Sequence, residues 1–131
     1  MDALHRPVPH GLSEDFRYKR PAVFTLDGVP FDGTHAWSQV YETLCRHLAK
    51  LKPAVFDQLP DNPYFISSRG NRYFSCQREN LRAAVDFGRG VFAETNLSAN
   101  QIRDNIARLV GAFELPRHAF TVFLGEDRDA G

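Results

Sequence analysis

Apolar and polar positions first form a regular pattern at residues 22–31. The stretch AVFTLDGVPF places a short apolar run on each side of Asp27-Gly28, the dipeptide that most favours a two-residue type I′ turn. In that register Phe24 faces Phe31 across the ladder. The pattern therefore predicts a β-hairpin with one apolar face.

Two longer segments carry apolar residues at intervals of three and four, which is typical of amphipathic helices. The first is expected to start at Thr34 as N-cap and to stop at Pro53, which opens a short helix to Leu59. Its apolar stripe comprises Trp37, Val40, Tyr41, Leu44, Cys45, Leu48 and Leu51. The second starts at Ser98, where Gln101 completes a capping box. Its stripe comprises Ile102, Ile106, Leu109, Val110 and Phe113.

A second hairpin is predicted where the runs YFISS and RYFSC flank Gly70-Asn71. If these two residues form the turn, Arg69 faces Arg72 at the tip. Like charges directly opposed on a ladder cost up to about 1 kcal/mol, and an anion bridging them would reverse that sign. If the turn is longer, the two arginines diverge.

The remaining elements complete the predicted fold. Residues 77–90 are expected to hold one helical turn around 80–85 and a glycine-flanked loop at 88–90, and strands are expected at 91–95 and 119–124. Strand pairs alternating with helices predict an α+β fold, with a mostly antiparallel sheet of hairpins and two main amphipathic helices packed on one face. The expected domain spans residues 22–124, between an N-terminal tail or arm (1–21) and an acidic C-terminal tail (125–131).

Overall charge gives no sign of a polyanionic partner. The 131 residues include 16 basic and 16 acidic side chains, so the net charge is zero. No apolar run approaches the length of a membrane-spanning helix and the N-terminus lacks a signal-peptide core, which predicts a cytoplasmic protein without a membrane partner. Any electrostatic partner must then be recognised by a local cluster of charge.

Known catalytic and metal motifs are missing from the sequence. No two histidines have the helical spacing of a zinc site, and there is neither a GxSxG elbow nor a phosphate-binding glycine loop. Asp57, Asp61, Asp86 and Glu94 are candidate carboxylates for a metal-dependent nuclease, but Asn96 stands where a lysine would be needed. We therefore expect no enzyme activity, no cofactor and no metal.

Arginines gather between residues 64 and 92, where five of them accompany only two acidic residues. Arginine suits bidentate contact with phosphate or carboxylate and stacks on bases. Arginines interleaved with aromatic residues are typical of nucleic-acid-binding surfaces and of protein interfaces. The same pattern also arises when the aromatic residues fill the core and the arginines are only solvated at the surface. The candidate binding residues are Tyr64, Arg69, Asn71, Arg72, Tyr73, Arg78, Arg82 and Arg89.

An ordered succession of short motifs resembles a small module of bacterial and phage proteins. In chain order it comprises Trp37-Ser38 with Val40 and Cys45, Pro53 and Phe56, Arg72-Tyr73-Phe74-Ser75, Leu81-Arg82, and ETNLSANQI at 94–102 followed by a helix rich in leucine, valine and phenylalanine. Sequences similar to it are appended to restriction and other DNA-acting proteins. The resemblance covers about residues 22–124 and implies a role in defence or DNA transactions, although here the module would be nearly the whole chain.

Two functional hypotheses follow. The first is a non-catalytic nucleic-acid-binding module, with DNA preferred over RNA, in which Arg69 and Arg72 neutralise phosphates while Tyr64 or Tyr73 stacks on a base. The second is a small inhibitor or adaptor of a phage–host or defence system that docks the same arginines on an acidic protein surface. We rank the first ahead of the second.

Overall fold

The Asp27-Gly28 dipeptide forms the turn predicted for it. In the computed structural model, which describes residues 8–125, strands β1 (Pro21–Leu26) and β2 (Val29–Phe31) pair antiparallel with Phe24 opposite Phe31. Asp27 and Gly28 both have positive φ, 53° and 82°, as a type I′ turn requires. The first predicted hairpin and its register are confirmed.

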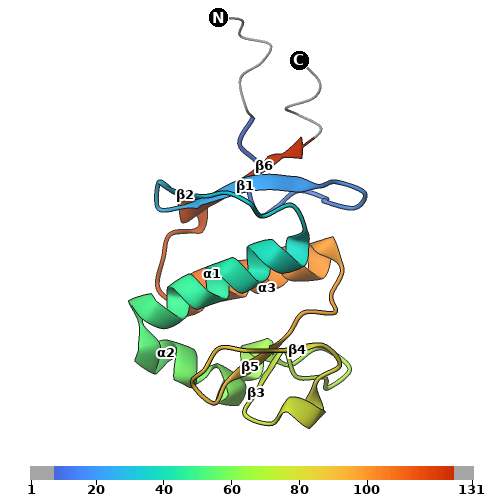
Figure 1. Ribbon diagram of the computed structural model, residues 1–131, viewed down its shortest axis with the longest axis vertical. Coiled ribbons are helices and arrows are strands. Elements are labelled where there is room, and N and C mark those ends of the chain that lie inside the picture. The colour runs from blue at the N-terminus through green and yellow to red at the C-terminus, as the bar shows by residue number, and fades with distance from the viewer. Residues whose placement is uncertain (1–7, 126–131) are drawn as a thin grey trace, which may run out of the picture. The chain divides into compact units, whose positions relative to one another are not determined.

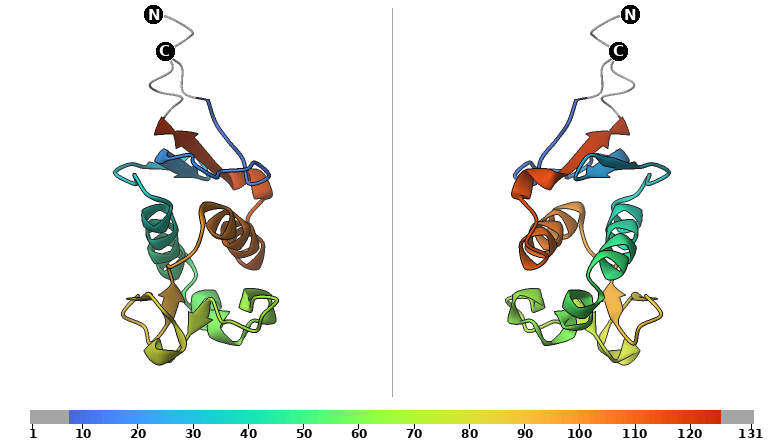
Figure 2. Two further views of the ribbon diagram at one scale, coloured as in Figure 1. Left: turned by 90° about the vertical axis from the view of Figure 1, so that its right-hand side faces the viewer. Right: turned by 90° about the vertical axis from the view of Figure 1, so that its left-hand side faces the viewer.

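The described chain divides into two units, which are treated separately below. Unit 1 consists of residues 8–40 and 98–125, and unit 2 is Tyr41–Leu97. In unit 1, strand β6 (Phe120–Leu124) pairs antiparallel with β1 and gives the sheet order β2-β1-β6. Helix α3 (Ala99–Ala112) lies along one face of this sheet (Figures 1 and 2).

The capping box at the start of α3 is confirmed. Ser98 Oγ accepts a hydrogen bond from the Gln101 amide at 3.2 Å, and Gln101 Oε1 accepts one from the Ser98 amide at 2.9 Å. All five residues of the predicted apolar stripe on this helix are buried. The capping box therefore sets where α3 starts, and the apolar stripe sets which of its faces is buried.

The described part of the expected N-terminal arm packs within unit 1. Leu12 and Phe16 are buried, and the Phe16 amide donates to Asn100 Oδ1 at 2.8 Å. The Phe16 ring lies 4.7 Å from that of Trp37. Most of the expected acidic tail, residues 126–131, lies outside the described residues.

Helix α1 (Trp37–Leu51) is confirmed, but its predicted N-cap is wrong. Thr34 is buried and its Oγ1 has no hydrogen-bond partner within residues 8–125. Gln39 Oε1 instead accepts from the amides of His35 and Ala36, at 2.8 and 3.1 Å. The helix begins three residues after Thr34, so a side chain from its first turn satisfies these amides.

Unit 2 holds helix α2 (Pro53–Asp57) and a second antiparallel sheet with the order β3-β5-β4. Its strands are β3 (Phe74–Ser75), β4 (Ala84–Asp86) and β5 (Phe92–Glu94). The α+β class is thus confirmed, with the strands divided between two three-stranded sheets. None of the helices in the described chain has the length and apolar character needed to span a bilayer.

Two predictions of secondary structure in unit 2 are wrong. Residues 64–68 are not a strand, because a 3-10 helix (Pro63–Phe65) begins after Asn62, whose Oδ1 accepts from the Tyr64 amide at 3.0 Å. The expected helical turn at 80–85 is replaced by a 3-10 turn (Arg78–Asn80) and by β4, which pairs with β5. In the first place the nearby Asn62 side chain binds a backbone amide, and in the second the Glu94 carboxylate, distant in sequence, accepts from the amides of Arg82 and Ala83.

Four aromatic rings form the core of unit 2. The ring of Phe74 meets those of Phe65 and Phe56 edge-on, at centroid distances of 5.2 and 6.1 Å, and lies 6.3 Å from that of Tyr41. All four residues are at most 1% exposed. This core joins β3 to the elements that precede it in the chain.

Candidate nucleic-acid interface

The turn at residues 67–71 is longer than predicted. The Ser67 carbonyl accepts from the Gly70 amide at 2.9 Å, which makes Ser68 and Arg69 the central residues, and Gly70 follows with φ +82°. The Ser67 amide donates to the Asn71 carbonyl at 2.7 Å. This is a hairpin loop of three residues with glycine at the left-handed position, so the predicted two-residue turn is wrong.

The longer turn separates the two arginines that the sequence places opposite each other. Ile66 bridges to Arg72, while Arg69 stays in the turn itself. Arg72 Nη1 donates to the Pro60 carbonyl at 3.0 Å and so ties the hairpin to the preceding loop. The predicted like-charge pair does not form, and Arg72 has a structural partner.

Of the remaining candidate arginines, two have a partner within the described chain and two have none. The guanidinium of Arg78 lies 5.2 Å from the centroid of the Phe92 ring, and Arg89 pairs with Asp57. The side chains of Arg69 and Arg82 have no hydrogen-bond or ion-pair partner in the described part of the chain, and both residues are exposed. These two cations are available to a ligand without breaking a protein contact.

The two candidate tyrosines differ in exposure. Tyr64 is 75% exposed, whereas Tyr73 is 9% exposed. Tyr73 is therefore too buried to serve as a stacking platform, and its amide bonds to the Phe65 carbonyl at 2.9 Å. Asn71 is exposed and completes the turn through its backbone. Stacking on a base thus falls to Tyr64.

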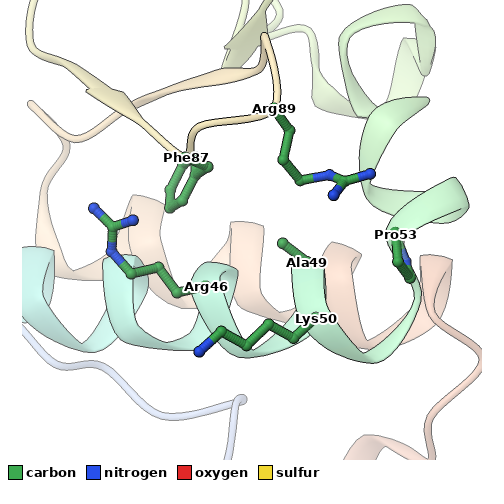
Figure 3. A pocket seen from close by; sticks show the side chains of 6 residues that line it. All are labelled: Arg46, Ala49, Lys50, Pro53, Phe87 and Arg89. Atoms are coloured by element: carbon green, nitrogen blue, oxygen red, sulfur yellow. The ribbon is translucent and has the colours of Figure 1, made fainter.

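A cleft with a basic lining lies beside α1 (Figure 3), with a volume of about 420 Å³. Arg46 and Lys50 lie one turn apart on α1. Arg89, which stands between Gly88 and Gly90 in the β4–β5 loop, reaches the cleft from the other side. Its lining residues are Arg46, Ala49, Lys50, Pro53, Phe87 and Arg89. Figure 3 shows the charged ends of Arg46 and Lys50 toward one end and that of Arg89 toward the other.

Both arginines of the cleft are oriented by carboxylates. Arg89 donates from Nε and Nη2 to the two oxygens of Asp57, at 2.9 and 2.8 Å. Arg46 donates from Nε and Nη2 to Glu42 Oε2, at 3.2 and 3.1 Å, and its guanidinium lies 5.1 Å from the Phe87 centroid. In each case Nη1 keeps its donors unused within residues 8–125, as does Lys50. The cleft therefore presents positioned donors to an anion.

The hydrogen bonds from Arg89 hold the pKa of Asp57 below its usual 3.8. Arg89→Ala is expected to return the Asp57 pKa toward 3.8, measured by NMR titration of the side-chain carboxyl carbon. The Asp57 pKa is lower in the folded state than in the unfolded state, so the ion pair stabilises the fold at pH values above the unfolded-state pKa. That stabilisation is lost as the pH falls through the folded-state pKa of Asp57. Arg82→Ala is the control and should leave the Asp57 titration unchanged. An unaltered Asp57 pKa in Arg89→Ala would contradict the assignment.

Sequence reasoning missed Arg46, Lys50 and Phe87. From the helical pattern alone the two cations fall outside the apolar stripe and are expected to be solvated, although their spacing of four residues places them on one side of α1. That spacing, together with an arginine between two glycines, was the available signal. What it could not show is that the β4–β5 loop brings Arg89 to the same cleft.

Two of the four candidate nuclease carboxylates have structural partners. Asp57 binds Arg89, and Glu94 is buried with its carboxylate accepting from the amides of Arg82, Ala83 and Asn96. Across residues 8–125 no three His, Cys, Asp or Glu side chains gather into a group that could hold a metal ion.

Charge is unevenly divided along the chain. Unit 2 carries eight basic and six acidic residues, a net of +2, and the rest of the chain carries the compensating −2.

Comparison with known proteins adds no assignment: no family model matches the chain, and neither a curated protein nor a solved structure matches it. A functional assignment must come from the residues of the site itself.

Proposed function

We propose that the chain is a non-catalytic nucleic-acid-binding module and that unit 2 carries the binding surface. The observation that supports this most directly is the pair Arg69 and Arg82, two exposed guanidiniums with no partner in the described chain, within a unit of net charge +2. The resemblance of its motifs to modules of DNA-acting proteins favours DNA over RNA. It also favours a cytoplasmic role in bacterial or phage defence or DNA transactions.

The chemistry of the surface suits a single strand. Arginines contact phosphates by bidentate hydrogen bonds and release condensed counterions, which supplies affinity without reading sequence. Tyr64, 75% exposed, offers a ring on which an unpaired base can stack. A chain of zero net charge binds through such a local surface, so we expect modest affinity that depends strongly on salt.

The salt dependence of binding tests this proposal. Affinity for a short single strand and for the matching duplex, measured by fluorescence anisotropy over a salt series, should fall steeply as salt rises. The double variant Arg69→Ala/Arg82→Ala should lower the slope of log K against log salt by about 1.4 for the single strand and about 1.8 for the duplex, since two phosphate contacts are lost.

Arg117→Ala is the matched control, because Arg117 is an exposed arginine of unit 1 without a partner in the described chain. It should leave the slope as in the wild type. Absence of binding to DNA and RNA at low salt would sink the proposal, and so would equal slopes for wild type and double variant.

One observation favours the alternative of an inhibitor or adaptor that docks on an acidic protein surface. Tyr64 and Ile66, 75% and 37% exposed, belong to the same hairpin region as Arg69. Exposed aromatic and aliphatic side chains beside arginine are typical of the centre of a protein interface. The salt series separates the two hypotheses, because a protein-docking module leaves the oligonucleotides unbound even at low salt.

A further inference from the structure

We propose that the cleft of unit 2 binds a nucleoside phosphomonoester, the phosphorylated terminal nucleotide of a strand. The inference rests on the proposed function and assigns it a second contact, separate from Arg69 and Arg82. The residues that carry it are Arg46, Lys50 and Arg89, with Ala49 between their charged ends and Pro53 beside the guanidinium of Arg89 in Figure 3.

The size and lining of the cleft suit such a ligand. Its volume of about 420 Å³ falls within the range of small-molecule sites, roughly 300–1,000 Å³. The lining combines cationic side chains toward both ends with apolar surface from Ala49, Pro53 and Phe87. A nucleotide has the same division, since an anionic group stands at one end of a largely uncharged sugar and base.

The donors at the first end suit a phosphate with several oxygens. Lys50 is exposed and has no partner within residues 8–125, so its ammonium can turn toward an incoming anion. Arg46 is held over Phe87 by its bonds to Glu42, with its Nη1 donors unused in the described chain. A terminal phosphate offers three oxygens and about −1.5 to −2 charge at neutral pH. It can accept from both side chains at once.

The other end offers flat surfaces for the base. The Arg89 guanidinium is planar and held in place by Asp57, and the Pro53 ring lies near it in Figure 3. Guanidinium planes stack on aromatic rings and bases. The Arg89–Asp57 pair also joins the β4–β5 loop to α2 at this end of the cleft. A strand end suits the cleft better than an internal nucleotide, because a terminal phosphate has three free oxygens for the cations at the other end.

The charges around the cleft favour an anionic ligand. Three cations line the cleft and two carboxylates, Glu42 and Asp57, are bound to two of them, which leaves a net of +1. Any anion gains from this charge, and a terminal phosphate, with three free oxygens, can accept from the unused donors of both Arg46 and Lys50 and still keep an oxygen for a further contact. The contribution of Lys50 should be the largest, because no carboxylate of the described chain shares it.

Three oligonucleotides of one sequence test the inference on the full chain: one with a 5′-phosphate, one with a 3′-phosphate and one with neither. We expect one phosphorylated form to bind about tenfold more tightly than the unphosphorylated strand. Lys50→Ala should reduce that preference to below about threefold while leaving the affinity of the unphosphorylated strand nearly unchanged. Arg117→Ala should keep the full preference.

The outcomes separate this inference from the proposed function. Salt-dependent binding of all three strands with equal affinity keeps the proposed function and overturns the terminal-phosphate site, as does a preference that Lys50→Ala leaves intact. If no strand binds, an NMR titration with AMP and with adenosine decides. Shifts of the Gly88 and Gly90 amides with AMP alone, lost in Lys50→Ala, would identify a free nucleotide as the ligand. Their absence would overturn the site as well, the proposed function being already overturned when no strand binds.

Discussion

Replacing Phe74 by alanine is expected to lower the free energy of unfolding by about 3–5 kcal/mol, the range for truncating a buried phenylalanine. Phe74 is 1% exposed, and its ring touches those of Phe65 and Phe56 edge-on. Truncation removes both aromatic contacts as well as the apolar area, and it leaves a cavity among the rings that pack around Phe74. Urea unfolding followed by circular dichroism measures the loss.

Tyr64→Ala is the matched control, because it truncates an aromatic ring of the same unit that is 75% exposed. Its expected change is within about 0.5 kcal/mol. Phe74→Leu keeps most of the volume and should fall between the two. If Phe74→Ala cost no more than Tyr64→Ala, the ring cluster would not be the core of unit 2.

The features predicted correctly from the sequence are those whose causes are local. The Asp27-Gly28 turn needs only two residues with positive φ, and the hairpin register follows from it. The start of α3 needs only Ser98 and Gln101, which satisfy each other's amides. A short stretch of sequence contains all the interacting groups in each case.

The features predicted wrongly depend on groups distant in sequence or on a choice between two local solutions. The hairpin at 67–71 could place either Gly70-Asn71 or Ser68-Arg69 at its centre, and the Ser67 Oγ that accepts from the Asn71 amide favours the longer loop. The segment before β4 is extended because Glu94, about a dozen residues later, holds its amides. Periodicity alone contains neither fact.

The candidate site shows the same division. Clustering of arginines between residues 64 and 92 is visible in the sequence, but their availability depends on partners that the sequence does not reveal. Arg72 is bound by the Pro60 carbonyl and Arg89 by Asp57, while Arg69 has no partner in the described chain. The cleft needed the loop carrying Arg89 to meet α1, a long-range contact with no local signature.

Glu94 links the fold of unit 2 to its candidate surface. The residue is 7% exposed, and its Oε1 accepts from the Arg82 amide at 2.7 Å. Its Oε2 accepts from the amides of Ala83 and Asn96, at 3.0 and 2.9 Å. One carboxylate thus holds the chain just before β4 and just after β5, and it fixes the backbone at Arg82. A group committed to three amides stabilises a loop in the way that an N-cap stabilises a helix.

Glu94→Gln is therefore expected to lower the free energy of unfolding by about 2–4 kcal/mol, because the amide group of glutamine turns an N–H donor toward at least one of these backbone donors and leaves it unsatisfied. Urea unfolding gives the magnitude, and hydrogen exchange should speed up at the amides of Arg82, Ala83 and Asn96. Glu79→Gln, an exposed glutamate of the same unit, should change the unfolding free energy by less than about 0.5 kcal/mol. Equal effects of the two substitutions would show that Glu94 does not hold this loop, and Arg82 would then lose the support that presents it to a ligand.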